Sequence, residues 1–415
     1  MKILYVSQYF PPEMGAPAAR AVELARHWVR AGHDVTVLTG FPNHPTGVVP
    51  PEWKPRLRNF VYDENVEGIR VVRTWLLPLP NRKAYERMLN YGSFAVSAAW
   101  RGMQISRPDV VIATSPQLLV GLSGWWISFW KRAPFVFEVR DLWPESLGAV
   151  GMGGEYSFLH RVLAKIAGFL YRKAARIVVV TPAFKEHLIQ HWQLRGEKIS
   201  IVENGVESSL FSPAAAREPL RSELGLAGRF VVGYIGTMGM AHGLDTLIEA
   251  ARTLQRSESK ISFLLVGEGA DKERIKGAIR SRGLSNICLV DQQRREAIPA
   301  YICATDVCLV LLKKTDLFKT VIPTKMLEFM SCARPVILGV DGQARQILEE
   351  ARGGVAIEPE NASALTDAIK TLAEDDSLRR ALGANARAYI VDRCSRAESA
   401  KTYIKILEKL VKESE

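Results

Sequence analysis

Short apolar runs rich in β-branched residues alternate with amphipathic helical segments along most of this chain. In the first half these runs are KILYVSQYF, GHDVTVLTG, VVIAT, FVFEV and RIVVVT. Between the first two runs, Ala18, Val22, Ala25 and Val29 recur at helical spacing, which predicts a helix over about residues 18–31. Strands that alternate with helices in this way indicate a parallel, doubly wound sheet.

The alternation pauses once and then begins again. Gly, Ser and Pro interrupt it in VENGVESSLFSP, residues 202–213, and a second series of strands then follows as FVVGYIG, ISFLLVGEG, NICLV, DVCLVLL and PVILGV. A chain of 415 residues is also too long for one ordinary core. We therefore expect two tandem Rossmann-like α/β domains, 1–205 and 206–395. The amphipathic tail, 396–415, is expected to form a capping helix that packs back on the N-terminal domain.

Positive charge and tryptophan concentrate in the first half of the chain. Residues 1–200 contain 25 Lys and Arg against 15 Asp and Glu, so they hold +10 of the net charge of +11, and they contain all nine Trp. Such a half favours an anionic partner, either nucleic acid or an anionic membrane surface. The segments PNRKAYERMLNYGSFAVSAAWRGMQISRP and GWWISFWKR combine basic and aromatic residues, as membrane interfaces do, although core packing also explains aromatic residues.

The longest uncharged run, VVIATSPQLLVGLSGWWISFW at 110–130, has the length of a membrane span. Its polar break TSPQ, which includes Pro116, favours a strand, a turn and a buried helix instead.

The N-terminal MKILYVSQYFPP has too short an apolar part for a signal peptide and predicts a first strand. Five Cys without a CxxC pair indicate reduced thiols and make a zinc site an unfavourable interpretation.

The segment TVIPTKMLEFMSCARPVI, residues 320–337, combines a cation and a carboxylate at the start of a helix. Pro323, Thr324 and Lys325 form its first turn, and Glu328 follows on the same face. The free N–H groups of such a turn favour an anion, and Lys325 adds a full positive charge. Because a carboxylate can accept hydrogen bonds from both hydroxyl groups of a ribose, the segment predicts a binding site for a nucleoside diphosphate. The alternative is an ordinary surface Lys–Glu pair, which contributes about 0.3 kcal/mol.

Other loops after predicted strands carry candidate binding residues, because ligands of doubly wound sheets bind at the carboxyl ends of the strands. In the second domain these residues are Gly236, Thr237, Gly239, His242, Gly243, Gly267, Glu268 and Gly269. In the first domain they are Gly15, Arg140, Asp141 and Glu145. A satisfied loop histidine is the alternative for His242, and a helix-start cap is the alternative for RDLWPE. The chain has no D-x-D pair, P-loop or HExxH motif, so we expect no metal.

In this order along the chain, the motifs resemble those of the family 4 retaining glycosyltransferases. The resemblance rests on PPEMGAPA, LARHWVRAGHDVTVLT, VENGVESSLFSP, YIGTMGMAHGLDTLIEAA, FLLVGEG and IPTKMLEFMSCARPVI. VRDLWPES and GTMGMAHG are most similar to the WbuB-type branch, which contains L-fucosamine transferases of O-antigen and capsule assembly. The family implies a GT-B architecture, with an N-terminal acceptor-binding domain and a C-terminal nucleotide-sugar-binding domain on either side of an interdomain cleft.

The resemblance also assigns roles to single positions. Glu328 matches the glutamate that holds the ribose hydroxyls, and Gly15 matches the glycine whose backbone approaches the diphosphate. The loop Gly267 to Gly269 matches the one near the nucleobase.

Three places depart from the family pattern. Thr320 stands where a glutamate usually contacts the transferred sugar, which predicts a donor with fewer hydroxyls, such as an acetamido or 6-deoxy acetamido sugar. Thr237 and His242 replace an Arg and a Lys that bind the phosphates, so Lys325 is expected to supply that charge. Arg140 replaces a histidine of the first-domain site.

These features predict a retaining glycosyltransferase of the hexosyltransferase type. It would move a sugar from a UDP-sugar to a lipid-linked acceptor in O-antigen, capsule or exopolysaccharide assembly. The expected location is cytoplasmic, peripheral on the inner face of the plasma membrane, and the UDP-sugar is a substrate rather than a cofactor. The predicted catalytic residues are Lys325, Glu328, Arg140, Asp141 and His242. The predicted donor-binding residues are Gly15, Gly236, Thr237, Gly267, Glu268, Gly269, Thr320, Pro323 and Thr324.

Two other functions compete with this prediction. A UDP-sugar epimerase of the same two-domain fold would use a similar nucleotide site. A nucleic-acid-binding protein would explain the positive charge, but the second half is nearly neutral and no recognised nucleic-acid module is present.

Overall fold

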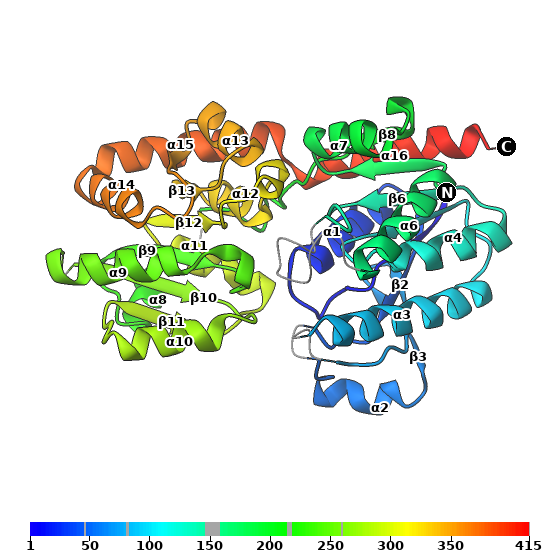
Figure 1. Ribbon diagram of the computed structural model, residues 1–415, viewed down its shortest axis with the longest axis horizontal. Coiled ribbons are helices and arrows are strands. Elements are labelled where there is room, and N and C mark those ends of the chain that lie inside the picture. Colours follow the sequence, from blue (N-terminus) through cyan, green and yellow to red (C-terminus); the bar gives the residue numbers. More distant parts are fainter. Residues whose placement is uncertain (45–46, 80–82, 146–157, 214–217, 259, 415) are drawn as a thin grey trace. The chain divides into compact units, whose positions relative to one another are not determined.

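The computed structural model describes residues 1–415 except 45–46, 80–82, 146–157, 214–217, 259 and 415. The chain divides into two compact units (Figure 1). The first unit combines Met1–Asn204 with Arg396–Glu415, and the second is Gly205–Ser395. Each unit is built around one sheet that carries helices, so the predicted pair of doubly wound α/β sheets is confirmed.

The first unit contains an eight-stranded sheet in the order β3-β4-β2-β1-β5-β6-β7-β8. Its strands are β1 (Lys2–Val6), β2 (Asp34–Gly40), β3 (Val61–Val66), β4 (Ile69–Thr74), β5 (Val110–Thr114), β6 (Phe135–Val139), β7 (Arg176–Val179) and β8 (Ile199–Ile201). β3 runs antiparallel to β4, whereas the other neighbours are parallel. All residues of β5 and β6 are buried, and this burial on both faces explains why their sequences are continuous apolar runs.

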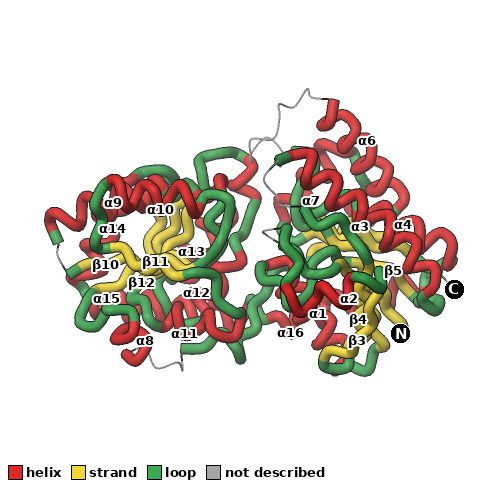
Figure 2. Tube along the Cα trace, turned by 90° about the horizontal axis from the view of Figure 1, so that it is seen from below, coloured by secondary structure: helices red, strands yellow, loops and turns green. Residues whose placement is uncertain are grey.

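Helices cover both faces of this first sheet. They are α1 (Ala16–Arg30), α2 (Lys54–Leu57), α3 (Ala84–Gln104), α4 (Val120–Lys131), α6 (Phe158–Lys173), α7 (Pro182–Trp192) and α16 (Arg396–Lys412), with short 3₁₀ turns η1 (Pro51–Trp53) and η2 (Gly196–Lys198). α3, α4 and α6 lie on one face, and α1 and α16 lie on the other (Figure 2). There, Trp28 of α1 lies between Tyr5 of β1 and Tyr403 of α16, with ring centroids 5.5 and 5.3 Å away. The C-terminal helix is therefore part of the core of the first unit.

The second unit contains a six-stranded parallel sheet in the order β11-β10-β9-β12-β13-β14. Its strands are β9 (Phe230–Ile235), β10 (Ile261–Val266), β11 (Ile287–Val290), β12 (Val307–Leu311), β13 (Val336–Gly339) and β14 (Gly354–Ala356). Its helices are α8 (Glu218–Glu223), α9 (Asp245–Ser257), α10 (Lys272–Ser281), α11 (Ile298–Cys303), α12 (Thr324–Ser331), α13 (Gln343–Ala351), α14 (Ala362–Glu374) and α15 (Asp376–Arg393), with 3₁₀ turns η3 (Met240–His242), η4 (Arg295–Ala297) and η5 (Leu317–Thr320). α9, α10 and α14 pack on one face of the sheet, while α11, α12, α13 and α15 pack on the other.

The strands predicted from apolar runs are present, but four further strands were missed. β8 and β14 have three residues each, which is too short to produce a pattern. β3 reads VYDENV and has no fully buried residue, because it lies at the edge of the sheet. β4 pairs with β3 as an antiparallel hairpin that interrupts the strand–helix alternation.

The uncharged run at 110–130 forms β5, a turn and α4, as its polar break predicts. α4 is not a wholly buried helix, however, because Trp126, Phe129 and Trp130 are exposed. Within the described ranges, no helix is both long and apolar enough to cross a membrane.

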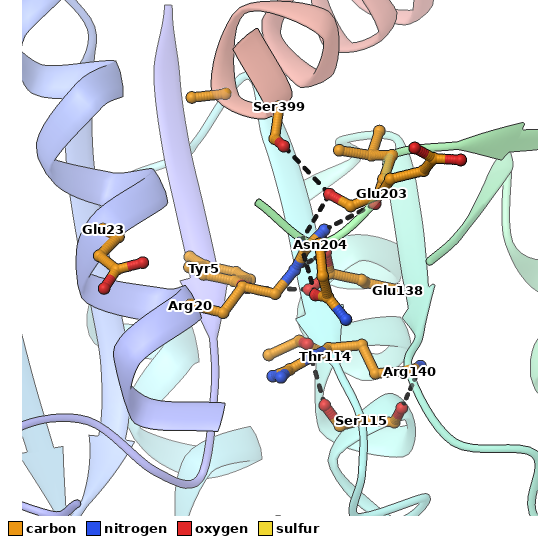
Figure 3. A network of polar contacts seen from close by, with 12 residues as sticks. Tyr5, Arg20, Glu23, Thr114, Ser115, Glu138, Arg140, Glu203, Asn204 and Ser399 are labelled. Carbon is orange, nitrogen blue, oxygen red and sulfur yellow. Dashed lines mark hydrogen bonds and ion pairs between the residues drawn. The ribbon is translucent and has the colours of Figure 1, made fainter. Parts of the chain in front are cut away.

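A buried ion pair ties α1 to the centre of the first sheet (Figure 3). Nη2 of Arg20 lies 2.9 Å from Oε1 of Glu138 on β6, and the Tyr5 hydroxyl donates to Oε2 of the same carboxylate at 2.8 Å. Arg20 also donates to the Val202 carbonyl at 3.1 Å and to Oδ1 of Asn204 at 3.0 Å. One side chain thus joins α1, the central sheet and the last residues before the second unit.

Candidate active site

The strand order of the second unit reverses between β9 and β12, the position at which doubly wound sheets bind ligands. The loops that follow these two strands touch, since the Lys313 N–H donates to the Ala241 carbonyl at 2.9 Å. The predicted residues of YIGTMGMAHG and of IPTK lie in these loops and at the start of α12. The topology therefore brings together two of the motifs that the sequence singled out.

The loops after β9 and β10 run side by side through their backbones. The Gly236 N–H donates to the Val266 carbonyl and the Met238 N–H to the Glu268 carbonyl, both at 2.9 Å. A Cβ on Gly267 would lie 2.0 Å from the Gly236 oxygen, and one on Gly269 would lie 2.3 Å from the Met238 oxygen. The positive φ angles of Gly267 (152°) and Gly269 (156°) add to this requirement. These two glycines are thus explained by close backbone packing.

Lys325 is a buried cation without a hydrogen-bond partner among the described residues. Its Nζ atom is buried and lies 4.2 Å from the ring centroid of Tyr234. The aliphatic stem passes Gly236, where an added Cβ would be 3.4 Å from Lys325 Cδ. Burial lowers the pKa of Lys325 to about 7. An aromatic face compensates only part of the lost hydration, so the site favours an anion beside this ammonium group.

His242 lies close to Lys325 and is neutral. Burial, and then the charge of Lys325, lower the pKa of His242 to about 3. Its Nδ1 atom lies 3.2 Å from both the N and the O atom of Gly239. A neutral imidazole offers one donor and one acceptor, so His242 can form hydrogen bonds to a ligand but does not add charge.

Glu328 pairs with an arginine that the sequence analysis did not identify. Nη1 of Arg295, in the turn η4, lies 2.9 Å from Oε1 of Glu328. The Arg295 guanidinium also lies over the Phe211 ring, 4.8 Å from its centroid. Because the Lys325 ammonium has no hydrogen-bond partner in the described chain, the alternative of an ordinary Lys325–Glu328 surface pair is wrong. The pair of basic residues in QQRREAIP, directly after β11, is the signal that points to Arg295.

The remaining predicted donor-binding residues occupy the ends of these elements. Pro323 is the N-cap of α12, so the helix begins at Thr324 rather than at the proline. Thr320 ends η5 and donates its hydroxyl to the Leu317 carbonyl at 2.7 Å. Thr237 is exposed. Glu268 accepts from Lys272 Nζ at 2.8 Å, so its charge is already compensated by a neighbouring side chain.

In the first unit, Arg140 and Asp141 follow β6 directly. Both backbone N–H groups donate to the Ser115 hydroxyl oxygen, at 2.7 and 3.3 Å. Nε and Nη1 of Arg140 are buried and find no hydrogen-bond partner in the described residues. Burial raises the pKa of Asp141 to about 6, although the charge of Arg140 acts in the opposite direction. Arg140 is therefore a second buried cation with free donors, near a carboxyl group that titrates close to neutrality.

Gly15 and a carboxyl group that the sequence analysis missed lie in the loop after β1. Gly15 is the N-cap of α1 and has φ 124°, which favours glycine. Glu13 is buried, and its Oε1 atom accepts the N–H groups of Asn43 and His44, both at 2.9 Å. Burial raises the pKa of Glu13 to about 7, while these two N–H groups act in the opposite direction. A carboxylate two positions before a loop glycine was a visible signal for this group.

Glu145, the third predicted residue of the loop after β6, is tied to α7. Its Oε1 atom lies 3.0 Å from Nε2 of His187 and accepts from the Trp192 indole at 3.2 Å. These contacts give Glu145 a structural role in the first unit. Among the residues that the structure describes, no group of three or more His, Cys, Asp or Glu side chains is placed to hold a metal ion.

Fold and sequence comparisons agree on the class of protein. The family described as "Glycosyl transferase 4-like domain" matches residues 15–205, and "Glycosyl transferases group 1" matches residues 216–389. The two matches, with these folds, define a glycosyltransferase of the GT-B type. The chain belongs to family 4 of these enzymes, and this result selects the glycosyltransferase over the epimerase of the same fold.

Individual relatives cover nearly the whole chain. The putative colanic acid biosynthesis glycosyl transferase WcaI of Escherichia coli is 25% identical over 89% of this chain and 91% of its own. Among solved structures, HepE of Anabaena in complex with UDP-glucose aligns with a TM-score of 0.73 at 20% identity, covering 99% of this chain and 100% of its own. WaaG, a glycosyltransferase involved in lipopolysaccharide biosynthesis, aligns with a TM-score of 0.70 at 16% identity, covering 98% and 99%. The similarity to the two structures establishes the GT-B fold.

Proposed function

We propose that this glycosyltransferase transfers a sugar, with retention of configuration, from a UDP-sugar to a lipid-linked acceptor during assembly of a surface polysaccharide. The second unit would bind the nucleotide sugar and the first unit the acceptor. The colanic acid and lipopolysaccharide relatives support the polysaccharide context. An O-antigen, a capsule or an exopolysaccharide is the product class that this context suggests.

The observation that carries the proposal is the buried ammonium group of Lys325 at the start of α12. It has no hydrogen-bond partner among the described residues, and it lies where the strand order of the sheet reverses. The first N–H groups of α12 add partial positive charge at the same place. A diphosphate supplies the negative charge that this arrangement lacks.

In the proposed reaction the protein forms no covalent bond to the substrate. The bond between the anomeric carbon and the diphosphate oxygen breaks, and the acceptor hydroxyl oxygen forms the new bond on the same face of the sugar. The hydroxyl proton passes to the departing diphosphate. Because negative charge grows on that diphosphate, Lys325 stabilises the transition state more than the ground state. His242 is proposed to donate a hydrogen bond there, and Arg140 with Asp141 to contact the reacting sugar.

The nucleotide can be tested directly by thermal unfolding in the presence of UDP and of GDP. A ligand at 100 times its dissociation constant adds about 2.7 kcal/mol to the free energy of unfolding. UDP is expected to raise the melting temperature, and GDP at the same concentration is expected to raise it much less. The UDP-glucose complex of the structurally similar HepE supports uracil as the base of the nucleotide. Preferential stabilisation by GDP would overturn the choice of donor.

Glu328→Ala is expected to weaken UDP binding by about 1.5–3 kcal/mol, because the ribose hydroxyls lose a charged acceptor. Nη1 of Arg295 lies 2.9 Å from this carboxylate and would hold it in place for the ribose. Isothermal titration calorimetry measures the change.

Glu349→Ala is the matched control for that variant. Glu349 is an exposed glutamate on α13 that pairs with Arg345 at 2.7 Å, so its loss should leave UDP affinity unchanged. Equal affinity of the parent and Glu328→Ala would remove Glu328 from the ribose site.

Thr320→Glu is expected to shift donor preference toward a UDP-hexose. The parent should use a UDP-acetamido sugar well, with UDP-N-acetyl-fucosamine as the first choice from the WbuB-type branch, and UDP-glucose poorly. A site built to bind a hydroxyl discriminates strongly against analogues that lack it, whereas a less polar site discriminates weakly. The measurement is UDP release from a donor panel with a lipid diphosphate sugar acceptor.

The carboxylate in this experiment needs its own control. Thr315→Glu places the same charge earlier in the same loop, where the Thr315 hydroxyl lies 3.4 Å from the Phe318 nitrogen. Its donor preference should match that of the parent. If UDP-glucose or GDP-mannose were the best donor for the parent, both the interpretation of Thr320 and the assignment to the WbuB-type branch would be contradicted.

A lipid-linked acceptor also implies a place in the cell. The proposed location is cytoplasmic, peripheral on the inner face of the plasma membrane, with the basic and Trp-rich first half in contact with anionic lipid. The net charge of +10 in residues 1–200 supports this orientation.

A further inference from the structure

α3 is apolar on two opposite faces, one of which has no cover from the described chain. Phe94 and Ala98 on its inner side are completely buried. On its outer side, Tyr85, Leu89, Val96 and Trp100 are spaced by four, seven and four positions, so they form one stripe along the helix. Val96 is 73% exposed and Trp100 is 74% exposed. A stripe of exposed apolar side chains along a helix indicates a contact with a partner.

The neighbouring helix α4 also carries exposed aromatic side chains. Trp126, Phe129 and Trp130 all face outward, and the Trp130 ring lies 5.7 Å from that of Trp126 and 5.6 Å from that of Phe129. The helices pack directly against each other, since the Ser123 hydroxyl donates to the Ala95 carbonyl at 2.8 Å. Figure 2 shows α3 and α4 on the same face of the first sheet. We call the set Tyr85, Leu89, Val96, Trp100, Trp126, Phe129 and Trp130 the aromatic surface.

The aromatic surface is a concentration rather than a scatter of single residues. It holds seven of the thirteen large apolar side chains that are exposed in the described part of the chain. Scattered exposed apolar residues are ordinary, but a continuous patch marks a contact with another protein or a membrane. Tryptophan, three of the seven, is the residue type enriched where a bilayer meets water.

The charges around the aromatic surface distinguish among the possible partners. Residues 83–132 contain six Lys or Arg and two Asp or Glu, and α6, beside α4, contains four cations and no acid. A second copy of the chain would place this cationic surface against itself, which like-charge repulsion disfavours. An anionic bilayer offers the opposite charge together with an apolar interior for the rings.

We propose that the first unit lies on anionic phospholipid through the aromatic surface, with the rings of α3 and α4 in the interfacial layer and the flanking cations at the headgroups. This inference names the face of the first unit that would meet the membrane. It rests on the proposed function only in assuming that the acceptor is linked to a lipid. α3 and α4 would then lie flat on the bilayer, parallel to its surface, rather than cross it.

Flotation of the full-length protein with vesicles tests the proposal. The vesicles are phosphatidylcholine alone or phosphatidylcholine with phosphatidylglycerol. The parent is expected to bind the phosphatidylglycerol vesicles, to be released by high salt, and to bind phosphatidylcholine alone weakly. The double variant Val96→Glu with Trp100→Glu should bind about tenfold or more weakly, because two apolar side chains that would enter the bilayer are replaced by charges.

The matched control is Val391→Glu on α15 of the second unit. Val391 is 50% exposed, so it also tests a charge at an exposed apolar position, but it lies outside the aromatic surface. Its vesicle binding should equal that of the parent. Because all of these side chains point to solvent, the melting temperatures of the variants should stay close to that of the parent.

Three results would overturn the proposal. In the first, the parent binds phosphatidylcholine vesicles as strongly as the anionic ones. In the second, Val391→Glu loses as much vesicle binding as the double variant does. In the third, the parent is a dimer, and the double variant becomes a monomer without a change in vesicle binding. UDP binding is measured on the same samples and should be unchanged in the variants. Failure of UDP to bind the parent would contradict the proposed function and leave the vesicle result standing, so the two failures are distinguishable.

Discussion

Lys325→Met is expected to lower the turnover number about 100- to 1,000-fold, the loss typical when one donor to a developing oxyanion is removed. Methionine keeps a stem of similar length against Gly236 and the Tyr234 ring, so the variant removes the charge and leaves most of the packing. The Michaelis constant should change less than the turnover number, because charge on the leaving diphosphate is greatest in the transition state. Release of UDP with a lipid-linked acceptor gives both constants.

Thermal stability provides a second measurement for the same variant. In the free protein the Lys325 ammonium is buried without a hydrogen-bond partner among the described residues, which is unfavourable for the folded state. Lys325→Met should therefore melt at the same temperature as the parent or higher, whereas loss of a structural lysine would lower it. Lys319→Met is the control, since Lys319 is exposed and pairs with Asp316 at 2.6 Å. A Lys325→Met enzyme with normal turnover and a raised Michaelis constant would reduce this residue to a binding role.

The pH dependence of UDP binding follows from the same burial. The pKa of Lys325 is lowered to about 7 in the free protein, and a bound diphosphate favours the charged form and so raises this pKa. UDP binding near and above neutral pH should therefore take up a proton, and affinity should fall as pH rises above 7. Calorimetry in buffers of different ionisation enthalpy measures the proton uptake. In Lys325→Met the uptake should vanish.

Pattern alone predicted the sheets of this protein, because parallel strands buried on both faces must be continuous apolar runs. Strand β12, DVCLVLL in the sequence, and the helix that starts beside Pro323 were both placed within about two residues. β14 was not found, because three half-buried residues carry too little pattern. The tail was predicted to be a helix, but its contacts with α1 depend on side chains far away in sequence.

The partners of the candidate site residues were less predictable than the positions of these residues in the loops. Spacing suggested that Lys325 and Glu328 share a face, but it could not show that Glu328 pairs with Arg295 while Lys325 turns toward Tyr234. Such choices depend on which strands become neighbours in the sheet. The carboxyl group of Glu13 was missed for a related reason, since the backbone N–H groups that donate to it lie 30 and 31 positions further along the chain.

Arg20→Ala is expected to lower the free energy of unfolding of the first unit by about 3–5 kcal/mol, because it leaves the buried carboxylate of Glu138 without its cation. The side chains of Arg20 and Glu138 are 1% and 0% exposed. The same guanidinium donates to Val202 and Asn204, whose neighbour Glu203 also accepts from the Ser399 hydroxyl at 3.0 Å (Figure 3). Removing Arg20 therefore opens the packing between α1, the sheet and α16 as well as the ion pair.

Denaturant unfolding of the full-length protein at several pH values measures this effect, with Arg26→Ala as the control. Arg26 is on the same helix, but its partner Glu67 is half-exposed, so its loss should cost no more than about 1 kcal/mol. Burial alone would raise the pKa of Glu138, but the charges of Arg20 and Arg140 hold it below its usual value. A carboxyl group with a lowered pKa stabilises the folded state above its unfolded pKa and loses that contribution as pH falls through the folded value. The difference in free energy of unfolding between the parent and Arg20→Ala should therefore be largest near neutral pH and decrease in acid. A difference as small as that for Arg26→Ala would show that the buried pair contributes no more than a surface pair.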